Sequence, residues 1–305
     1  MLRKINLVGT GTYTVSLPST WVKENSLQKG DILSVDSDNH VISYSVHKKK
    51  TQKSIEICID NFDYLQLSKT LIILYNDNFE KIILRHSKSH IEYKSKNESF
   101  PIIDILHKLV NRHIGMELTD LKSKYSQLEV FLRPLADEPQ VIELRIYYIL
   151  KEYCKSLLEG PMDENSEQNS HDTAVKFIFY YLRLINYSKS VSVQRICSAY
   201  MIRLDSLCDT CRHLNQDMKV FNLSKETKEL MEKIFSWFFE VIKPSVKISD
   251  NMIKQRYKLL EELKCTKLTH SDWIIASQLR QFLDSFNEIS LFKQLSFIED
   301  NQVKL

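Results

Sequence analysis

Glycine is scarce in this chain and is confined to its first 160 residues. There are five glycines among 305 residues, and none follows Gly160. Because glycine supplies the backbone conformations that tight turns need, this distribution indicates a turn-rich, β-containing front and a helical back. The sequence therefore favours an α+β protein whose strands and long helices are separated along the chain.

Long apolar runs are also lacking. No stretch reaches the ~20 apolar residues that a membrane span requires. Charged residues stand near the N-terminus, where a signal peptide would carry an apolar run. We therefore expect no membrane insertion and a cytoplasmic location.

Cysteine is present, but its six positions are too scattered for the framework of a secreted disulfide-rich domain. Cys208 and Cys211 are close enough in sequence to be a metal or redox pair. No second pair completes a zinc site, and a position inside a helix offers no N-terminal dipole to acidify a thiol. We predict that both are buried core residues.

Catalytic motifs are absent as well. The sequence holds no glycine-rich phosphate loop and no nucleophile elbow, and its nine histidines do not fall at ligand spacing. The net charge is only +3, but residues 1–53 hold eight Lys or Arg against four Asp or Glu. A local basic excess on a small domain is typical of a polyanion partner. We expect a binding protein and not an enzyme.

The first fifty residues predict two hairpins around one short helix. Alternation favours strands at 2–9 and 12–17, joined by a turn at Gly9-Thr10-Gly11. Ser19 or Thr20 is the expected cap of a short helix. A turn at Lys29-Gly30-Asp31 then leads to strands at 32–35 and 41–44. So short a segment cannot bury much apolar surface alone, which argues for pairing with a second copy.

The rest of the chain divides into a mixed middle and a helical back. We interpret residues 1–47 as one domain, 48–135 as a small α+β connector and 136–305 as a helical domain. In the connector we expect strands at 55–59, 81–84 and 128–132, and helices at 62–75 and from Pro101 onward. In the helical domain we expect six helices, near 137–158, 172–187, 192–214, 224–243, 246–265 and 271–300. Short connections favour two three-helix bundles, at about 136–215 and 222–305.

The front segment carries a family resemblance. Gly9, Gly11, Ser16-Leu17-Pro18 and Gly30-Asp31 occur in an order that resembles the AbrB/SpoVT-type domain of archaeal regulators. The resemblance covers roughly residues 2–46. It implies a swapped-hairpin dimer, in which strands of two chains complete one β-barrel and present a basic face to DNA.

Five residues of this segment are candidates for DNA contact. Arginine grips phosphate or guanine with two hydrogen bonds, and lysine neutralises phosphate. We assign Arg3, Lys4 and Lys23 to phosphate, and Thr12 and Tyr13 to base edges or sugars. The alternative is that these are solvated charges on a module that only dimerises. The lysine run at 48–50 is interpreted as a solvated linker.

Two carboxylates four residues apart occur twice on predicted helices, as Asp205 with Asp209 and as Asp284 with Glu288. Like charges at this spacing repel by a few tenths of a kcal/mol unless a nearby cation neutralises them. The cation is either a bound metal ion or a nearby basic side chain. Arg212 and Arg280 lie three and four residues from an acid of each pair and offer the second possibility.

The repeated acid pair resembles PhoU, whose two three-helix bundles hold metal ions on acid-x-x-x-acid motifs. Further similar segments run from Arg112 to Glu117 and at His171-Asp172. The resemblance implies a divalent or ferric ion, with Asp172 as a further ligand. Lys176 stands where the family usually has a second acid, and Asn251 and Gln255 replace carboxylates in the second bundle. An ammonium opposes binding of a hard cation.

Together these resemblances predict a homodimeric transcription regulator of phosphate uptake, in which the front binds DNA and a PhoU-like body senses phosphate status. The chief alternative is a PhoU-type adaptor that contacts components of a phosphate ABC transporter, with the front serving only for dimerisation. A metal-dependent enzyme would need further ligands beside Asp205 and Asp209.

Overall fold

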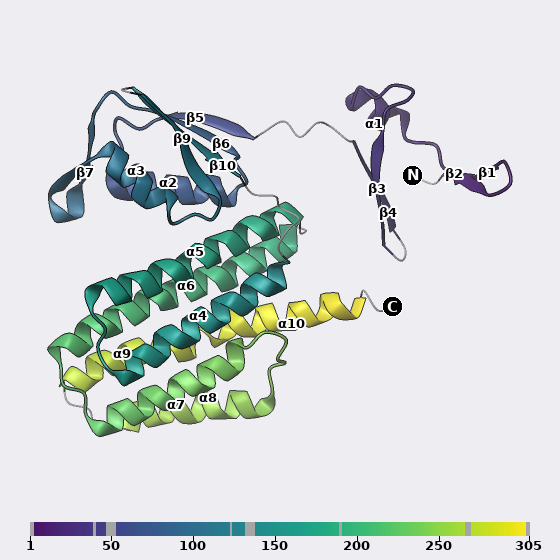
Figure 1. Ribbon diagram of the computed structural model, residues 1–305. Helices are drawn as coiled ribbons and strands as arrows, with labels where there is room; N and C mark the ends of the chain where they lie inside the picture. Colours follow the sequence, from purple (N-terminus) through teal and green to yellow (C-terminus); the bar gives the residue numbers. More distant parts are fainter. Residues whose placement is uncertain are drawn as a thin grey trace. The chain divides into compact units, whose positions relative to one another are not determined.

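The chain is a mixed α+β protein that divides into two compact units, residues 1–51 and 52–304. A computed structural model describes residues 3–38, 41–46, 53–122, 124–131, 138–188, 191–265 and 270–302. In these ranges every strand ends by Val130, and only helices follow it (Figure 1). The α+β class, with strands in front and long helices behind, is therefore confirmed.

The first unit contains the two predicted hairpins. β1 (Asn6–Val8) pairs antiparallel with β2 (Thr12–Thr14) across the glycine turn, and β3 (Leu33–Asp38) pairs antiparallel with β4 (Val41–Val46). The hairpins form separate two-stranded sheets. The β-barrel expected from two swapped chains stays a prediction.

The short helix α1 (Ser19–Glu24) lies where we predicted it, but neither expected cap residue caps it. Pro18 holds the capping position, and no side chain caps the helix. Ser19 and Thr20 are already its first helical residues. The carbonyl of Pro18 accepts a hydrogen bond from the Val22 amide at 3.0 Å, which the fixed φ of proline favours.

The connector is built on a four-stranded sheet in the order β5-β6-β10-β9. Its strands are β5 (Ser54–Cys58), β6 (Lys81–Arg85), β9 (Met116–Lys122) and β10 (Tyr125–Val130). β5 and β6 are parallel and are connected by helix α2 (Tyr64–Asn76), whereas the other pairs are antiparallel. Strand β10 starts three residues before the predicted 128, because it pairs along its length with the unpredicted β9.

A second, two-stranded sheet of β7 (His90–Tyr93) and β8 (Glu98–Pro101) was also missed by the sequence prediction. A single 3₁₀ turn at Lys94–Lys96 lies between the two strands. Helix α3 (Ile102–Val110) follows β8 directly and buries five apolar side chains. Strands β7 and β8 were not predicted because each is only four residues long, and half of these residues are exposed.

The helical part consists of two groups of three helices and one further helix (Figure 1). Helices α4 (Pro139–Glu159), α5 (Glu164–Ser188) and α6 (Val191–Val220) pack against one another. Helices α7 (Lys225–Ile242), α8 (Asp250–Cys265) and α9 (His270–Asp284) do the same. Helix α10 (Phe286–Gln302) packs against α6, α7 and α9.

Four of the six predicted helices have different bounds in the structure. Helix α6 ends at Val220 and not near 214, and helix α8 begins at Asp250 and not near 246. Helix α5 begins at Glu164 and not near 172, because the Asp163 carboxylate accepts a hydrogen bond from the Ser166 amide at 2.9 Å and caps the helix. The predicted helix 271–300 is divided at Ser285 into α9 and α10. The Ser285 hydroxyl donates to the Phe282 carbonyl at 2.6 Å.

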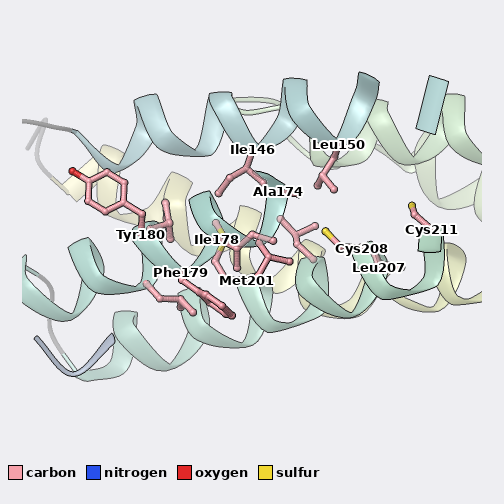
Figure 2. Packing of buried hydrophobic residues seen from close by; sticks show 14 of the residues in the cluster. Ile146, Leu150, Ala174, Ile178, Phe179, Tyr180, Met201, Leu207, Cys208 and Cys211 are labelled. Carbon is pink, nitrogen blue, oxygen red and sulfur yellow. The ribbon is translucent and has the colours of Figure 1, made fainter. Parts of the chain in front are cut away.

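Cys208 and Cys211 of α6 lie in the core formed by α4, α5 and α6 (Figure 2). Cys208 and Cys211 are buried together with Leu207, as we predicted. The Sγ atom of Cys211 is 3.7 Å from the Sγ of Cys154 on α4. Burial raises the pKa of the Cys208 thiol well above its usual value, so the thiol stays protonated and behaves as a small apolar group.

Arg183 connects helix α5 to the connector. Its guanidinium is buried and donates to the carbonyl of Tyr75, within the last turn of α2, and to the carbonyl of Phe79, just beyond the helix. The amide of Asn186, one turn further along α5, donates to the Asn76 carbonyl at 2.8 Å. The C-terminal carbonyls of α2 are thus satisfied by side chains of α5, and a cation there complements the helix dipole.

None of the helices in the described ranges combines the length and the apolar character that a bilayer span requires.

Candidate functional site

The five residues predicted to contact DNA all lie on the surface of the first unit. Arg3 and Lys4 precede β1, Thr12 and Tyr13 lie in β2, and Lys23 lies in α1; all five are exposed. Thr12 and Tyr13 are successive strand residues, so their side chains leave opposite faces of the hairpin. They cannot both face one flat surface.

The first unit also exposes its apolar side chains. No described side chain of this unit is buried. Its exposed large apolar residues are Ile5, Leu7, Val8, Tyr13, Val15, Ile32, Val35, Ile42 and Tyr44. The exposed fraction reaches 75% at Ile32 and 73% at Tyr13. Solitary exposed apolar residues are ordinary, but a whole set on two hairpins indicates a surface that another chain covers.

The first acid pair lies on α6, and its two members have different surroundings. Burial, with the nearby Asp209 carboxylate, raises the pKa of Asp205 to about 6. Asp209 is half exposed and accepts hydrogen bonds from His171 Nε2 at 3.1 Å and from the Arg212 guanidinium. The His171 hydrogen bond and Arg212 hold the pKa of Asp209 below its usual value despite partial burial.

Asp172 lies beside this pair, and His171 bridges it to Asp209. The Nδ1 atom of His171 is 3.5 Å from Asp172 Oδ1, and a guanidinium nitrogen of Arg112 is 3.1 Å from the same oxygen. Burial lowers the pKa of His171, but the hydrogen bonds with both carboxylates raise it more, so its net shift is upward. The site is therefore an ionic network of α5, α6 and the segment after α3.

The second acid pair is divided between two helices. Asp284 ends α9 and lies 3.3 Å from the Nε of Arg280 and 3.8 Å from a guanidinium nitrogen of Arg256. Glu288 lies in α10, and its Oε2 atom is buried without a hydrogen-bond partner in the described part of the chain. We had expected both acids on one face of a single helix, and the break at Ser285 corrects this.

Arginine side chains pair with one acid at each place, Asp209 and Asp284, whereas Asp205 and Glu288 form no such ion pair within the described ranges. Arg212 and Arg280 form the ion pairs that the sequence offered as the alternative to a metal ion. Within the described ranges, no group of three or more His, Cys, Asp or Glu side chains is arranged to hold a metal ion. Asn251 and Gln255 are exposed on α8, and Lys176 is half-buried on α5. The guanidinium groups beside Asp209 and Asp284 disfavour a metal ion on those two carboxylates.

His171 and Arg112 were noted in the sequence only as parts of the PhoU resemblance, without a role. The ion pair of Arg212 with Asp209 could be predicted because it joins neighbours on one helix. The contact between His171 and Asp209 spans 38 residues and arises from the packing of α5 on α6. No pattern within either helix reveals it.

Comparison of the chain with protein-family models, with curated proteins and with solved structures found no match in any of the three.

Proposed function

We propose that this chain is a homodimeric transcription regulator of phosphate uptake that binds DNA through its first unit. The observation that carries the proposal is the surface of that unit, which combines exposed apolar hairpins with exposed basic side chains. The apolar side chains favour pairing with a second copy. The basic side chains favour a polyanion.

Pairing is supported by the amount of apolar surface. Complete burial of a large apolar side chain is worth about 1.5–3 kcal/mol, so burial of half of this set would contribute on the order of 10 kcal/mol. That is comparable with the free-energy cost of bringing two chains together. A β-barrel completed by strands of two chains is a structure that would bury these residues.

DNA binding is supported by Arg3, Lys4 and Lys23. None of the three forms an ion pair with another described residue, so all are available to phosphate oxygens. A symmetric dimer would present about six such charges and would give a slope of log K against log salt near −5. One of Thr12 and Tyr13 would face the DNA, because they leave opposite faces of β2.

The phosphate link rests on the resemblance of the helical half to PhoU, and the packing of its helices in two groups of three is consistent with it. Coupling of this half to DNA binding requires two conformations with different DNA affinity. The adaptor alternative keeps the dimer and the helical body but contacts phosphate transporter components in place of DNA. Because Asp209 and Asp284 pair with arginine, the proposal does not depend on a bound metal ion.

The test is fluorescence anisotropy of the full chain on DNA from upstream of its own gene and of phosphate-transporter genes, over a series of salt concentrations. We expect binding that exceeds binding to scrambled DNA. The double variant Arg3→Ala/Lys4→Ala should weaken it at least ~100-fold and reduce the salt slope by about four, because a dimer loses four phosphate contacts.

The matched control is Lys228→Ala/Lys254→Ala, which removes two exposed charges from the helical half and should leave binding unchanged. Binding no better than to scrambled DNA, and equal in both double variants, would refute the regulator. It would favour the adaptor.

A further inference from the structure

The connector contains a cavity of about 640 Å³ at one edge of its main sheet. It is lined by the segments that follow β5 and β6, by the β7–β8 hairpin and by the first residue of α3. β5 and β6 are parallel neighbours, so their carboxyl ends and the loops after them meet at the same edge. This edge is where open α/β sheets bind their ligands.

The cavity has an apolar floor and a polar rim. Ile59, Ile91 and Ile102 are buried beneath it. The polar groups of the rim come from three segments, as Asn61 after β5, Ser87 and Lys88 after β6, and Glu92 and Lys94 in the hairpin. Its volume is that of sites for small organic ligands, which combine an apolar wall with a few polar groups that fix orientation.

The loop after β6 is held in place from three sides. The Ser87 amide donates to Asp60 Oδ1 at 2.6 Å, which connects it to the loop after β5. The Ser89 carbonyl accepts from the Ile102 amide at 3.0 Å. The buried imidazole of His86 lies 3.2 Å from the Lys88 carbonyl through Nδ1 and 3.0 Å from Ser126 Oγ through Nε2. The rim is therefore organised before any ligand binds.

The His86 contacts also define its role. A carbonyl only accepts, so Nδ1 donates to the Lys88 carbonyl, and Nε2 is hydrogen-bonded to the Ser126 hydroxyl. Both nitrogens are engaged within the protein, so His86 positions the loop and is not itself a ligand-binding group.

The charged groups of the rim define the ligand. Lys88 and Lys94 are exposed, and neither ammonium pairs with a carboxylate of the described residues. The Asp60 carboxylate is engaged by the Ser87 amide and by the Cys58 thiol, whereas Glu92 has no such partner in the described ranges. Two lysines suit a phosphate group, and a carboxylate with an amide suits hydroxyl groups.

We propose that this cavity binds a small organic phosphate that carries hydroxyl groups, with Lys88 and Lys94 on the phosphate and Glu92 and Asn61 on the hydroxyls. Inorganic phosphate would leave most of the cavity unfilled, so the ligand is a phosphomonoester of sugar or nucleotide size. The cavity is lined by none of the predicted DNA contacts and none of the acidic residues described in the helical half, so it stands or falls independently of the proposed function.

The test is isothermal titration calorimetry of the full chain with ribose 5-phosphate, adenosine 5′-monophosphate, inorganic phosphate and ribose. We expect one of the two phosphomonoesters to bind, and its identity distinguishes a sugar phosphate from a nucleotide. Lys88→Ala and Lys94→Ala should each weaken binding about tenfold or more, as expected for loss of a charge-assisted hydrogen bond. The double variant should abolish binding.

Lys69→Ala is the matched control, because Lys69 is an exposed lysine on α2 outside the cavity. Circular dichroism melting should be the same for the wild type and all four variants, since both rim lysines are exposed. Absence of binding by either phosphomonoester, binding of inorganic phosphate alone, or equal binding by the double variant would overturn the proposal.

Discussion

Asp205→Asn should stabilise the protein at pH 8, although it removes a charged residue of the candidate metal site. The pKa of Asp205 is about 6 in the folded chain, because the carboxylate is buried beside Asp209. An unfolded aspartate titrates near ~3.9, so the folded state binds the proton about two pKa units more tightly. The folded state is therefore destabilised as pH rises from about 4 through 6, by up to ~3 kcal/mol above that window.

Asparagine has almost the same shape and carries no charge, so the variant should gain most of this free energy at pH 8. The gain should fall below about 1 kcal/mol at pH 4.5, where the wild-type carboxyl is largely protonated when folded. Urea unfolding followed by circular dichroism, at both pH values and with a chelator present, measures the difference.

Asp209→Asn on the same helix is the matched comparison and should change stability in the opposite direction. The pKa of Asp209 is lowered by its hydrogen bond with His171 and by Arg212, so its charge is favourable in the folded state. Its stabilisation is present above the unfolded pKa and is lost as pH falls through the folded one. Because the side chain is 47% exposed, we expect a loss of no more than about 1 kcal/mol at pH 8. A loss of stability in Asp205→Asn at pH 8, or a gain independent of pH, would refute this account of the site.

Two buried basic residues, Arg183 and Lys293, allow similar measurements of the free energy of unfolding. Arg183→Ala should cost about 4 kcal/mol in urea unfolding, because two carbonyls lose a charged donor, whereas the exposed Arg195→Ala should cost less than about 0.5 kcal/mol. Lys293→Met should cost about 3 kcal/mol in thermal or urea unfolding, since it leaves Glu143 buried without its partner 3.4 Å away. The double variant Lys293→Met/Glu143→Gln should recover most of that loss. Equal costs for the two arginine variants, or no recovery in the double variant, would contradict these assignments.

Local chemistry made part of the fold predictable. The glycine turn between β1 and β2 was located because few residues other than glycine adopt the φ of +67° found at Gly9. The end of α5 was located, but its start was not. Residues 164–171 are polar and poor in strong helix formers, and they are helical because Asp163 caps them and Glu167 and His171 are buried. Tertiary packing decided that boundary.

Prediction of the sites had the same limit. The ion pairs of Arg212 and Arg280 follow from spacing on one helix, and both are present. The pKa shift of Asp205 depends on how deeply α6 is covered, which no residue pattern in α6 reports. The cavity in the connector also depends on the β7–β8 hairpin beside the ends of β5 and β6, and the sequence did not predict that hairpin.

The exposed hairpins of the first unit have a consequence for abundance. A segment that covers its apolar residues only by joining a second chain becomes ordered in a bimolecular step, so its active fraction depends on how much protein the cell contains. For the proposed dimer, halving the gene dosage would lower the dimer concentration by more than half when the protein concentration is near the dissociation constant of the dimer. The amount of this protein would itself be a regulatory input, in addition to any ligand.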